Sequence, residues 1–208
     1  MAPVRDPQWH DRLRAAVTPL ASGVRSLKVA GYRPSGTTGW RPNRTAAVLV
    51  PLLDLDEPEV VLTRRADHLP THAGQISFPG GAAEEDDRTA VDTALREAWE
   101  EIGLPAERVT PIGFLDRMDT ISDYRVLPVV ALVRRPAVWR PDQSEVAEVF
   151  SVPVSVALDR NRYESRIVTR DQERFTIHSL QWGEYTIWGA TAAMLLNLAH
   201  RLESANVR

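Results

Sequence analysis

The chain of 208 residues contains no cysteine. This absence excludes disulfide bonds, thiolate metal sites and a cysteine nucleophile, and it is compatible with a reducing compartment. Long apolar runs are also missing, so no segment approaches the length that spans a membrane. The first ten residues lack the apolar core of a signal peptide. We therefore expect a cytoplasmic protein without a membrane partner.

The chain also lacks a strong excess of either charge. It has 25 basic and 28 acidic residues, for a formal net charge of -3. A protein that binds nucleic acid non-specifically needs a basic surface, so we expect no nucleic-acid partner. Apolar residues make up 43% and charged residues 25% of the chain, as in ordinary globular proteins. The length suffices for one domain with a sizeable core and an appendage.

The run from Gly74 to Leu104 concentrates the residues that carry chemistry. In its first part, Ile76 and Phe78 alternate with polar residues, as in a short strand. A Pro-Gly-Gly sequence then breaks the chain. Its glycines, Gly80 and Gly81, permit the backbone to come close to a bound group.

The second part of this run has the spacing of a helix. Glu97, Glu100 and Glu101 share one face, because side chains three and four residues apart lie together. A second, apolar stripe can pack on a core, and it comprises Val91, Leu95, Ala98 and Ile102. Gly103 is predicted to end the helix. The acidic face is either simply solvated or neutralised by divalent cations, which prefer oxygen ligands.

The rest of the chain alternates between strands and helices. Apolar patterning predicts strands at residues 45–53, 59–64, 75–78, 109–116, 125–133, 163–169 and 175–180, of which the first two form a hairpin. It predicts a helix at Gln8–Leu20, a short element at 144–150, a helical turn at 154–158 and a long helix at 185–202. Pro128 implies an edge or a bulge in its strand. This order predicts an α/β fold, with a mixed sheet between helices in an α/β/α sandwich.

The N-terminal part is predicted to be separate from the main domain. Residues 1–44 form a helical arm and a linker, because the segment from Gly31 to Arg44 is rich in proline and glycine. Residues 45–208 form the main domain. The apolar face of the first helix is compatible with two interpretations, a helix docked on the domain or a contact in a homodimer.

The sequence Arg96–Leu104, R-E-A-W-E-E-I-G-L, resembles the end of the Nudix box, G-x5-E-x7-R-E-U-x-E-E-x-G-U, where U is apolar. Six defined positions match in order: Arg96, Glu97, Glu100, Glu101, Gly103 and Leu104. This pattern is far more specific than three carboxylates alone. The resemblance implies a Nudix-like α/β/α sandwich and hydrolysis of a diphosphate bond with Mg²⁺ or Mn²⁺.

The upstream run Leu62–Gly81 resembles the coenzyme A diphosphatase branch of this family, whose segment reads L-L-T-x-R-[SA]-x3-R-x3-G-x3-F-P-G-G. The matching residues are Leu62, Thr63, Arg65, Ala66, Gly74, Phe78, Pro79, Gly80 and Gly81. The sequence Ile187–Ala192, I-W-G-A-T-A, is also similar to this branch. The resemblance covers about Thr45 to Leu202. It implies a coenzyme A-like nucleotide as the small-molecule substrate.

Two positions depart from these patterns. Gly81 lies one residue too far from Arg96, so the first glutamate of the box falls on Arg88 when counted back from Arg96 and on Asp87 when counted forward from Gly81. Pro70 stands where the branch has arginine, which removes a cation that could hold a phosphate.

The resemblance assigns roles to particular residues. Glu97, Glu100 and Glu101 are expected to be metal ligands and catalytic groups, with Arg96 anchoring loop carboxylates. A late acidic residue outside the box, Glu145 in preference to Glu148, is expected to complete the catalytic set. The candidate substrate contacts are Arg65, His72, Phe78, Gly80 and Gly81.

Three functions remain open at this point. The first is a metal-dependent hydrolase that cleaves coenzyme A or acyl-CoA to (acyl-)4′-phosphopantetheine and adenosine 3′,5′-bisphosphate. The second is a diphosphatase acting on ADP-ribose or another nucleoside diphosphate derivative, motivated by Pro70. The third is a nucleotide-binding module without catalysis, motivated by the imperfect start of the box. The intact Glu97, Glu100 and Glu101 speak against the third.

Overall fold

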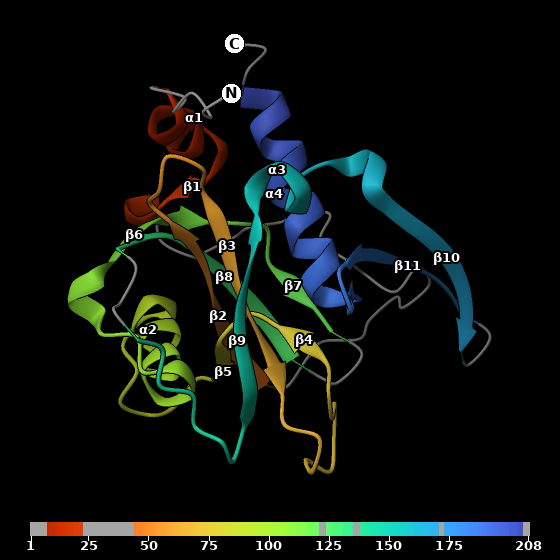
Figure 1. Ribbon diagram of the computed structural model, residues 1–208. Coiled ribbons are helices and arrows are strands. Elements are labelled where there is room, and N and C mark those ends of the chain that lie inside the picture. Colours follow the sequence, from red (N-terminus) through yellow and green to blue (C-terminus); the bar gives the residue numbers. More distant parts are fainter. Residues whose placement is uncertain (1–7, 23–43, 121–123, 135–137, 171–172, 206–208) are drawn as a thin grey trace.

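The computed structural model describes residues 8–22, 44–120, 124–134, 138–170 and 173–205 (Figure 1). Its helices are α1 (Trp9–Ala16), α2 (Ala90–Ile102), α3 (Val154–Ala157) and α4 (Ala190–Ala205), with 3-10 turns η1 (Leu20–Ser22), η2 (Ala106–Arg108) and η3 (Arg160–Arg162). Its strands are β1 (Thr18–Pro19), β2 (Arg44–Leu53), β3 (Glu59–Arg65), β4 (Ile76–Ser77), β5 (Gly80–Ala82), β6 (Val109–Phe114), β7 (Met118–Asp119), β8 (Tyr124–Val133), β9 (Val146–Pro153), β10 (Tyr163–Arg170), β11 (Glu173–Trp182) and β12 (Tyr185–Trp188).

Strand β2 lies in the middle of a mixed sheet whose described strands follow the order β1-β6-β8-β2-β3-β4, with β5, β7 and β9 attached to β2, β8 and β3. Strands β2 and β8 are parallel along their whole length, and the other described pairings of this sheet are antiparallel. Leu52 lies opposite Val60 where β2 turns back into β3. The predicted hairpin is therefore confirmed.

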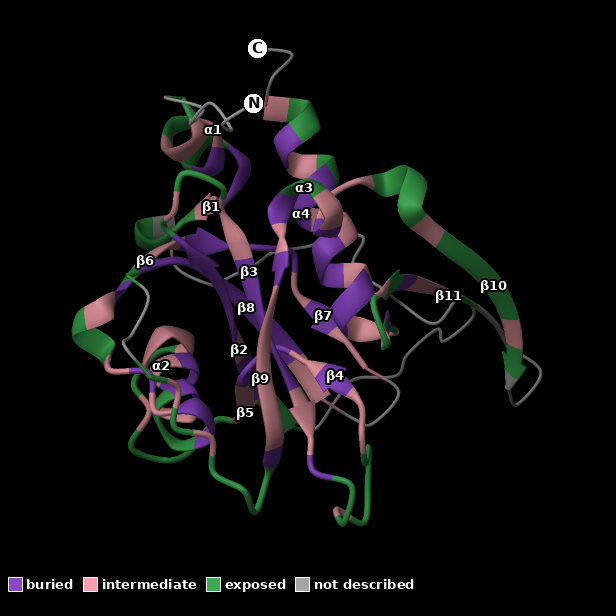
Figure 2. Ribbon diagram, in the orientation of Figure 1, coloured by how far each residue is buried: buried purple, intermediate pink, exposed green. Residues whose placement is uncertain are grey.

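Each face of the sheet packs against its own helices. Side chains along a strand alternate between the two faces, and β2 divides its residues accordingly. Ala47 and Leu49 pack with α2, whereas Val50 and Leu52 pack with α1, α3 and α4. Figures 1 and 2 show α2 on one side of the sheet and buried strands in the centre. The predicted α/β/α layering is confirmed.

Helix α2 has clear signals at both ends. The side chain of Thr89 accepts a hydrogen bond from Asp92 N at 3.2 Å, which caps the first turn. Gly103 has a left-handed backbone with φ of 63° and ends the helix, as predicted. Between these caps, Ala98 and Ile102 are fully buried. Burying a side chain the size of Ile102 stabilises the fold by about 1.5–3 kcal/mol.

The first helix is shorter than its apolar spacing predicts, because it ends at Ala16 instead of Leu20. Thr18 precedes a proline, and the residue before proline is disfavoured in a helix. The chain there becomes β1, with Thr18 opposite Phe114 of β6. Residues 8–22 thus contribute a helix and an additional edge strand.

Residues 8–22 pack into the same core as the main domain. Leu13 is fully buried there. Arg201 of α4 holds the end of α1, since its guanidinium donates to Ala16 O, to Thr18 Oγ1 at 3.0 Å and to the Asp116 carboxylate. The division of the chain at residues 44 and 45 stays a prediction, because residues 23–43 lie outside the described part.

Of the two alternatives predicted for Pro128, an edge or a bulge, the edge is wrong, and the β6–β8 pairing has a register shift nearby, opposite Val130 and Ala131. Strand β8 lies between β2 and β6. Pro128 is tolerated because it faces the short connection between β6 and β7 on one side, where Leu115 N donates to its carbonyl at 3.0 Å. The N–H that proline lacks would point to that same side, where no strand needs it.

A second sheet follows β9 and has the order β10-β11-β12. Its first two strands were predicted, although their connection at residues 171–172 lies outside the described part. The predicted helix at 185–202 is wrong at its start. Tyr185 is the first residue of strand β12 and lies opposite Trp182 of β11. Helix α4 begins only after Gly189, whose φ is 65°. None of the helices in the described residues is long and apolar enough to cross a membrane.

Candidate active site

Strand β5 brings the backbone directly against α2. A Cβ at Gly81 would lie 2.4 Å from the Glu97 Oε1 atom, and one at Gly80 would lie 2.5 Å from Ala47 O. At Gly80 the obstacle is the backbone of β2 and φ is 156°, so only glycine fits there, whereas a side chain at Gly81 would have to displace the end of the Glu97 side chain. The close approach of this backbone to a bound group stays a prediction.

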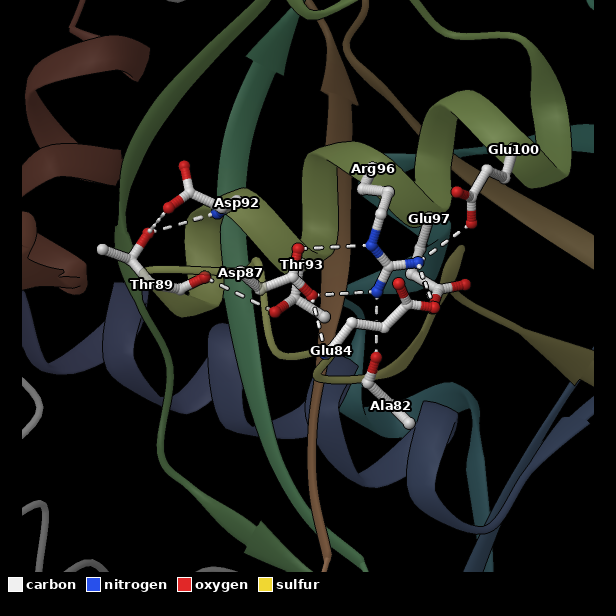
Figure 3. A network of polar contacts seen from close by, with 9 residues as sticks. All are labelled: Ala82, Glu84, Asp87, Thr89, Asp92, Thr93, Arg96, Glu97 and Glu100. Carbon is white, nitrogen blue, oxygen red and sulfur yellow. Dashed lines mark hydrogen bonds and ion pairs between the residues drawn. The ribbon is translucent and has the colours of Figure 1, made fainter.

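Arg96 is the centre of an acidic cluster (Figure 3). Its guanidinium donates to both carboxylate oxygens of Asp87 at 3.2 and 2.9 Å and to Ala82 O at 3.0 Å. Its Nη1 donates to Glu97 at 3.0 Å and to Glu100 at 2.9 Å. One cation thus connects β5, the acidic loop and α2. Its carboxylate partners raise the pKa of Arg96 further.

The cluster decides between the two counts for the start of the Nudix-like box. Asp87 is the residue that contacts Arg96, and its side chain is only 7% exposed. The hydrogen bonds from Arg96 lower the pKa of Asp87 to about 2. Arg88, by contrast, is 89% exposed and lies 3.8 Å from Asp92. The forward count from Gly81, with one additional loop residue, fits the structure.

Glu101 is a buried carboxylate, with only 5% of its side chain exposed. Its Oε2 accepts a hydrogen bond from Gly80 N at 3.2 Å, and its Oε1 lies 4.0 Å from Arg65 Nη1. Burial, together with the nearby charges of Glu97 and Glu145, raises the pKa of Glu101 to about 8. The Gly80 N–H and Arg65 both lower the pKa of Glu101, but their effect is smaller than that of burial.

The three glutamates of α2 do not share one environment, although their spacing predicts a common face. The side chain of Glu100 is 54% exposed, that of Glu97 15% and that of Glu101 5%. Glu101 belongs to the buried side of the helix, which β5 and β2 cover. Burial also raises the pKa of Glu97. The exposure of the three carboxylates therefore falls from Glu100 at the surface through Glu97 to Glu101 in the interior.

Glu145 lies in the turn before β9, and the first part of β9, from Val146 to Phe150, takes up most of the short element expected at 144–150. Two contacts hold this turn to the segment after β3: Ala66 N donates to Glu145 O at 2.8 Å, and His68 Nε2 lies 3.1 Å from Ser144 O. The charge of Glu145 raises the pKa of Glu101, so its carboxylate lies near the cluster.

Glu148, the alternative to Glu145, is engaged elsewhere. It accepts a hydrogen bond from the Tyr185 hydroxyl at 2.8 Å and lies 3.8 Å from Arg64. The Tyr185 ring stacks on Phe150 with their centroids 4.0 Å apart. These contacts join the small sheet to the large one. The contacts of Glu148 therefore serve the packing of the two sheets.

The candidate substrate contacts are in different surroundings. Arg65 is half-buried, and its Nε is buried without a hydrogen-bond partner in the described residues. His72 is exposed, has a left-handed φ of 58° and bonds Gln75 through Nδ1 at 2.7 Å. Phe78 is only 3% exposed and packs in the core. Its ring is covered in this structure, and its contact with substrate stays a prediction.

In the described residues, no three His, Asp or Glu side chains are already grouped as a metal site. Glu97 and Glu100 turn toward Arg96, and Glu101 turns toward Gly80. The donor set nevertheless fits a hard divalent cation, because all three donors are carboxylates. The raised pKa of Glu101 reflects first its burial and, to a smaller extent, the negative charges of Glu97 and Glu145.

Comparisons with known proteins agree with this arrangement. A NUDIX domain model matches residues 43–172 of the chain. The uncharacterized Nudix hydrolase NudL of Pectobacterium atrosepticum is 42% identical over 156 residues, covering 75% of this chain and 81% of that protein. NudL of Yersinia pestis is 41% identical over 160 residues, covering 77% of this chain and 80% of that protein.

A solved structure supports the fold. The MutT protein from Methanosarcina mazei superposes with a TM-score of 0.50 and 18% identity, covering 82% of this chain and all of that one. At this identity the likeness concerns the fold alone. The family match and the close relatives establish more: the chain belongs to the Nudix hydrolase family and is a hydrolase acting on phosphorus-containing anhydrides.

Proposed function

We propose that this Nudix hydrolase is a metal-dependent diphosphatase that cleaves coenzyme A or acyl-CoA to (acyl-)4′-phosphopantetheine and adenosine 3′,5′-bisphosphate. The observation that carries the diphosphatase is the buried Glu101 carboxylate beside Glu97, Arg65 and the Gly80 N–H. The resemblance of Leu62–Gly81 to the coenzyme A branch supports the substrate.

Glu97, Glu100 and Glu101 would hold Mg²⁺ or Mn²⁺. Bound there, a divalent cation would supply positive charge to the diphosphate oxygens and acidify a water molecule. The protein prepares this position by fixing the helix. Arg96 binds Glu97 and Glu100 in α2 and Asp87 in the preceding loop, whereas Glu101 is held by the Gly80 N–H.

The remaining residues act on the substrate and on protons. In the overall step, water attacks one phosphorus, the bond from that phosphorus to the bridging oxygen breaks, and the water gives up a proton. Glu145 and Glu97 are the carboxylates available to take this proton. Arg65 would contribute positive charge to the phosphates. Gly80 and Gly81 would let the diphosphate come close to the backbone, and exposed His72 is a further phosphate contact.

A second candidate substrate is ADP-ribose or another nucleoside diphosphate derivative. Pro70 favours it, because this position lacks the arginine of the coenzyme A branch. Arg64 does not replace that cation freely, since it bonds Asp67 at 2.9 and 3.1 Å and lies near Glu148. Arg65 is therefore the remaining cation for substrate recognition in this segment.

A substrate panel tests the proposal. The purified chain would be incubated with coenzyme A, acetyl-CoA, ADP-ribose and a dinucleotide, each with Mg²⁺ or Mn²⁺, and the products separated by chromatography. We expect coenzyme A or acetyl-CoA to give adenosine 3′,5′-bisphosphate at the highest rate. Ready cleavage of ADP-ribose without any coenzyme A product over hours would reject the substrate, and no cleavage in the whole panel would favour a binding module.

A further inference from the structure

The small sheet ends in an open edge strand. Strand β10 pairs with β11 on one side, and no other described strand pairs with it. Figure 1 shows β10 at the rim of the molecule, projecting away from the large sheet, and Figure 2 shows most of it exposed. An edge strand offers unpaired N–H and C=O groups to another chain.

This edge lacks two of the usual features that prevent pairing, proline and a bulge. The β10 sequence, Y-E-S-R-I-V-T-R, contains no proline, and its eight pairs with β11 run from Tyr163 to Arg170 without a register shift. The side chain of Ile167 is exposed, at 59%. Proteins protect an edge with proline, a bulge or charged side chains. Strand β10 has no proline and no register shift, and its charged side chains carry both signs.

The charges on β10 are of opposite sign and close together. Glu164 and Arg166 are two residues apart, so they lie on the same face of the strand. Their neighbours on β11 are uncharged, since Glu164 lies opposite Ser179 and Arg166 opposite Ile177. In the described residues, neither charged side chain has a recorded ion pair or hydrogen bond. Within the described residues, both charges are therefore available to a second chain.

We propose that β10 binds the β10 strand of a second copy of this chain, antiparallel and centred on Ser165. A two-fold axis at Ser165 places Glu164 opposite Arg166 of the other copy, and Arg166 opposite its Glu164. Directly opposed side chains in antiparallel strands have Cβ atoms about 4.5–5.5 Å apart, close enough for an ion pair. The same register sets Ile167 opposite Tyr163 of the other copy. The two small sheets thereby form one continuous sheet.

Charge variants of the full-length chain test the register. Sedimentation velocity over about 1–100 μM would give the dimer dissociation constant. Arg166→Glu sets like charges opposite each other twice, so we expect dimerisation to weaken about tenfold or more. The double variant Glu164→Arg/Arg166→Glu restores opposite charges, and we expect its dissociation constant to return to within about threefold of wild type. An unchanged constant in Arg166→Glu, or no recovery in the double variant, would overturn the proposal.

Because the chain has no cysteine, a single introduced cysteine allows the predicted register to be measured by disulfide cross-linking. Directly opposed Cα atoms are about 4.5–5.5 Å apart in antiparallel strands, within the range that a disulfide bridges. Ser165→Cys is therefore expected to give a disulfide-linked dimer under mild oxidation. Thr169→Cys is the matched control, since its two copies would lie roughly 27 Å apart. A monomer at all concentrations, or equal cross-linking by both variants, would overturn the proposal.

Discussion

Two arginines hold clusters of polar groups at different places in this fold, and their charge balance differs. Arg201 binds one carboxylate, Asp116, together with neutral oxygens of Ala16 and Thr18. Arg96 binds Asp87, Glu97 and Glu100, and the buried Glu101 lies on the same helix. The first cluster is balanced, as a structural tie should be. The second has more carboxylates than cations, and that excess is what a divalent cation would neutralise.

Glu101→Gln should produce the largest effect, because it removes a buried charge from the cluster with the excess. We expect kcat/KM for the diphosphate substrate to fall about 10²–10³-fold, as when one transition-state stabiliser is lost. The free energy of unfolding without metal should not decrease, since burial disfavours this charge. Steady-state kinetics and urea unfolding measure the two quantities. Glu107→Gln, at an exposed glutamate, is the control, and an unchanged rate in Glu101→Gln would reject the assignment.

Arg201→Ala should show the opposite pattern. It leaves Asp116 without its cation and releases the end of α1, so we expect the free energy of unfolding to fall by about 2–3 kcal/mol. Activity per folded molecule should be retained, because Arg201 lies outside the acidic cluster. Urea denaturation with Asp116→Asn and the double variant forms the matched cycle. Full additivity of the two single variants would show that the pair does not couple.

Acid should weaken the Arg96 cluster through Asp87. The pKa of Asp87 is about 2 when folded and near 4 in an unfolded chain. Its stabilisation is therefore fully present above the unfolded value and lost as the pH falls through about 2. We expect it to amount to roughly 2 kcal/mol. Comparing wild type with Asp87→Asn in pH-dependent unfolding isolates this contribution, and a constant difference from pH 6 to pH 2 would contradict it.

Glu84→Gln should have the smallest effect. Its carboxylate lies 3.7 Å from Arg96 Nη1 but is 66% exposed. Exposed ion pairs contribute little, so stability should change by less than about 0.5 kcal/mol and kcat/KM by less than about threefold. Thermal unfolding and kinetics in parallel with Glu101→Gln check this. A loss of kcat/KM as large as that of Glu101→Gln would contradict this. It would mean that the number of carboxylates, and not their burial, determines how much each glutamate contributes to activity.

Local signals predicted the elements that lie nearest the site. Strand β2 is apolar along its length because both of its faces are buried, and α2 carries its own stop at Gly103. The spacing also found Glu97, Glu100 and Glu101. It could not distinguish their environments, because the burial of Glu101 depends on Gly80 and β5 lying against the helix. That contact joins residues 21 positions apart.

Other features depend on contacts that no local pattern carries. The apolar residues of 185–202 fit a helical period, yet Tyr185–Trp188 is a strand because β11 provides a pairing edge. Gly189 was the available signal for the boundary. Arg201 and Asp116 are 85 positions apart, so their pairing follows only from the packing of α4 on the sheet. Sequence spacing likewise left Asp87 and Arg88 as equal alternatives until the loop geometry separated them.

The most direct test of the account is a metal titration of coenzyme A cleavage by the full-length chain. Initial rates would be measured without divalent ions, with chelator, and with increasing Mg²⁺ or Mn²⁺, and adenosine 3′,5′-bisphosphate would be identified as the product. We predict no cleavage without divalent ions and a saturable rate with them. Cleavage that persists at the same rate in chelator would contradict the assignment of Glu97, Glu100 and Glu101 to a metal site.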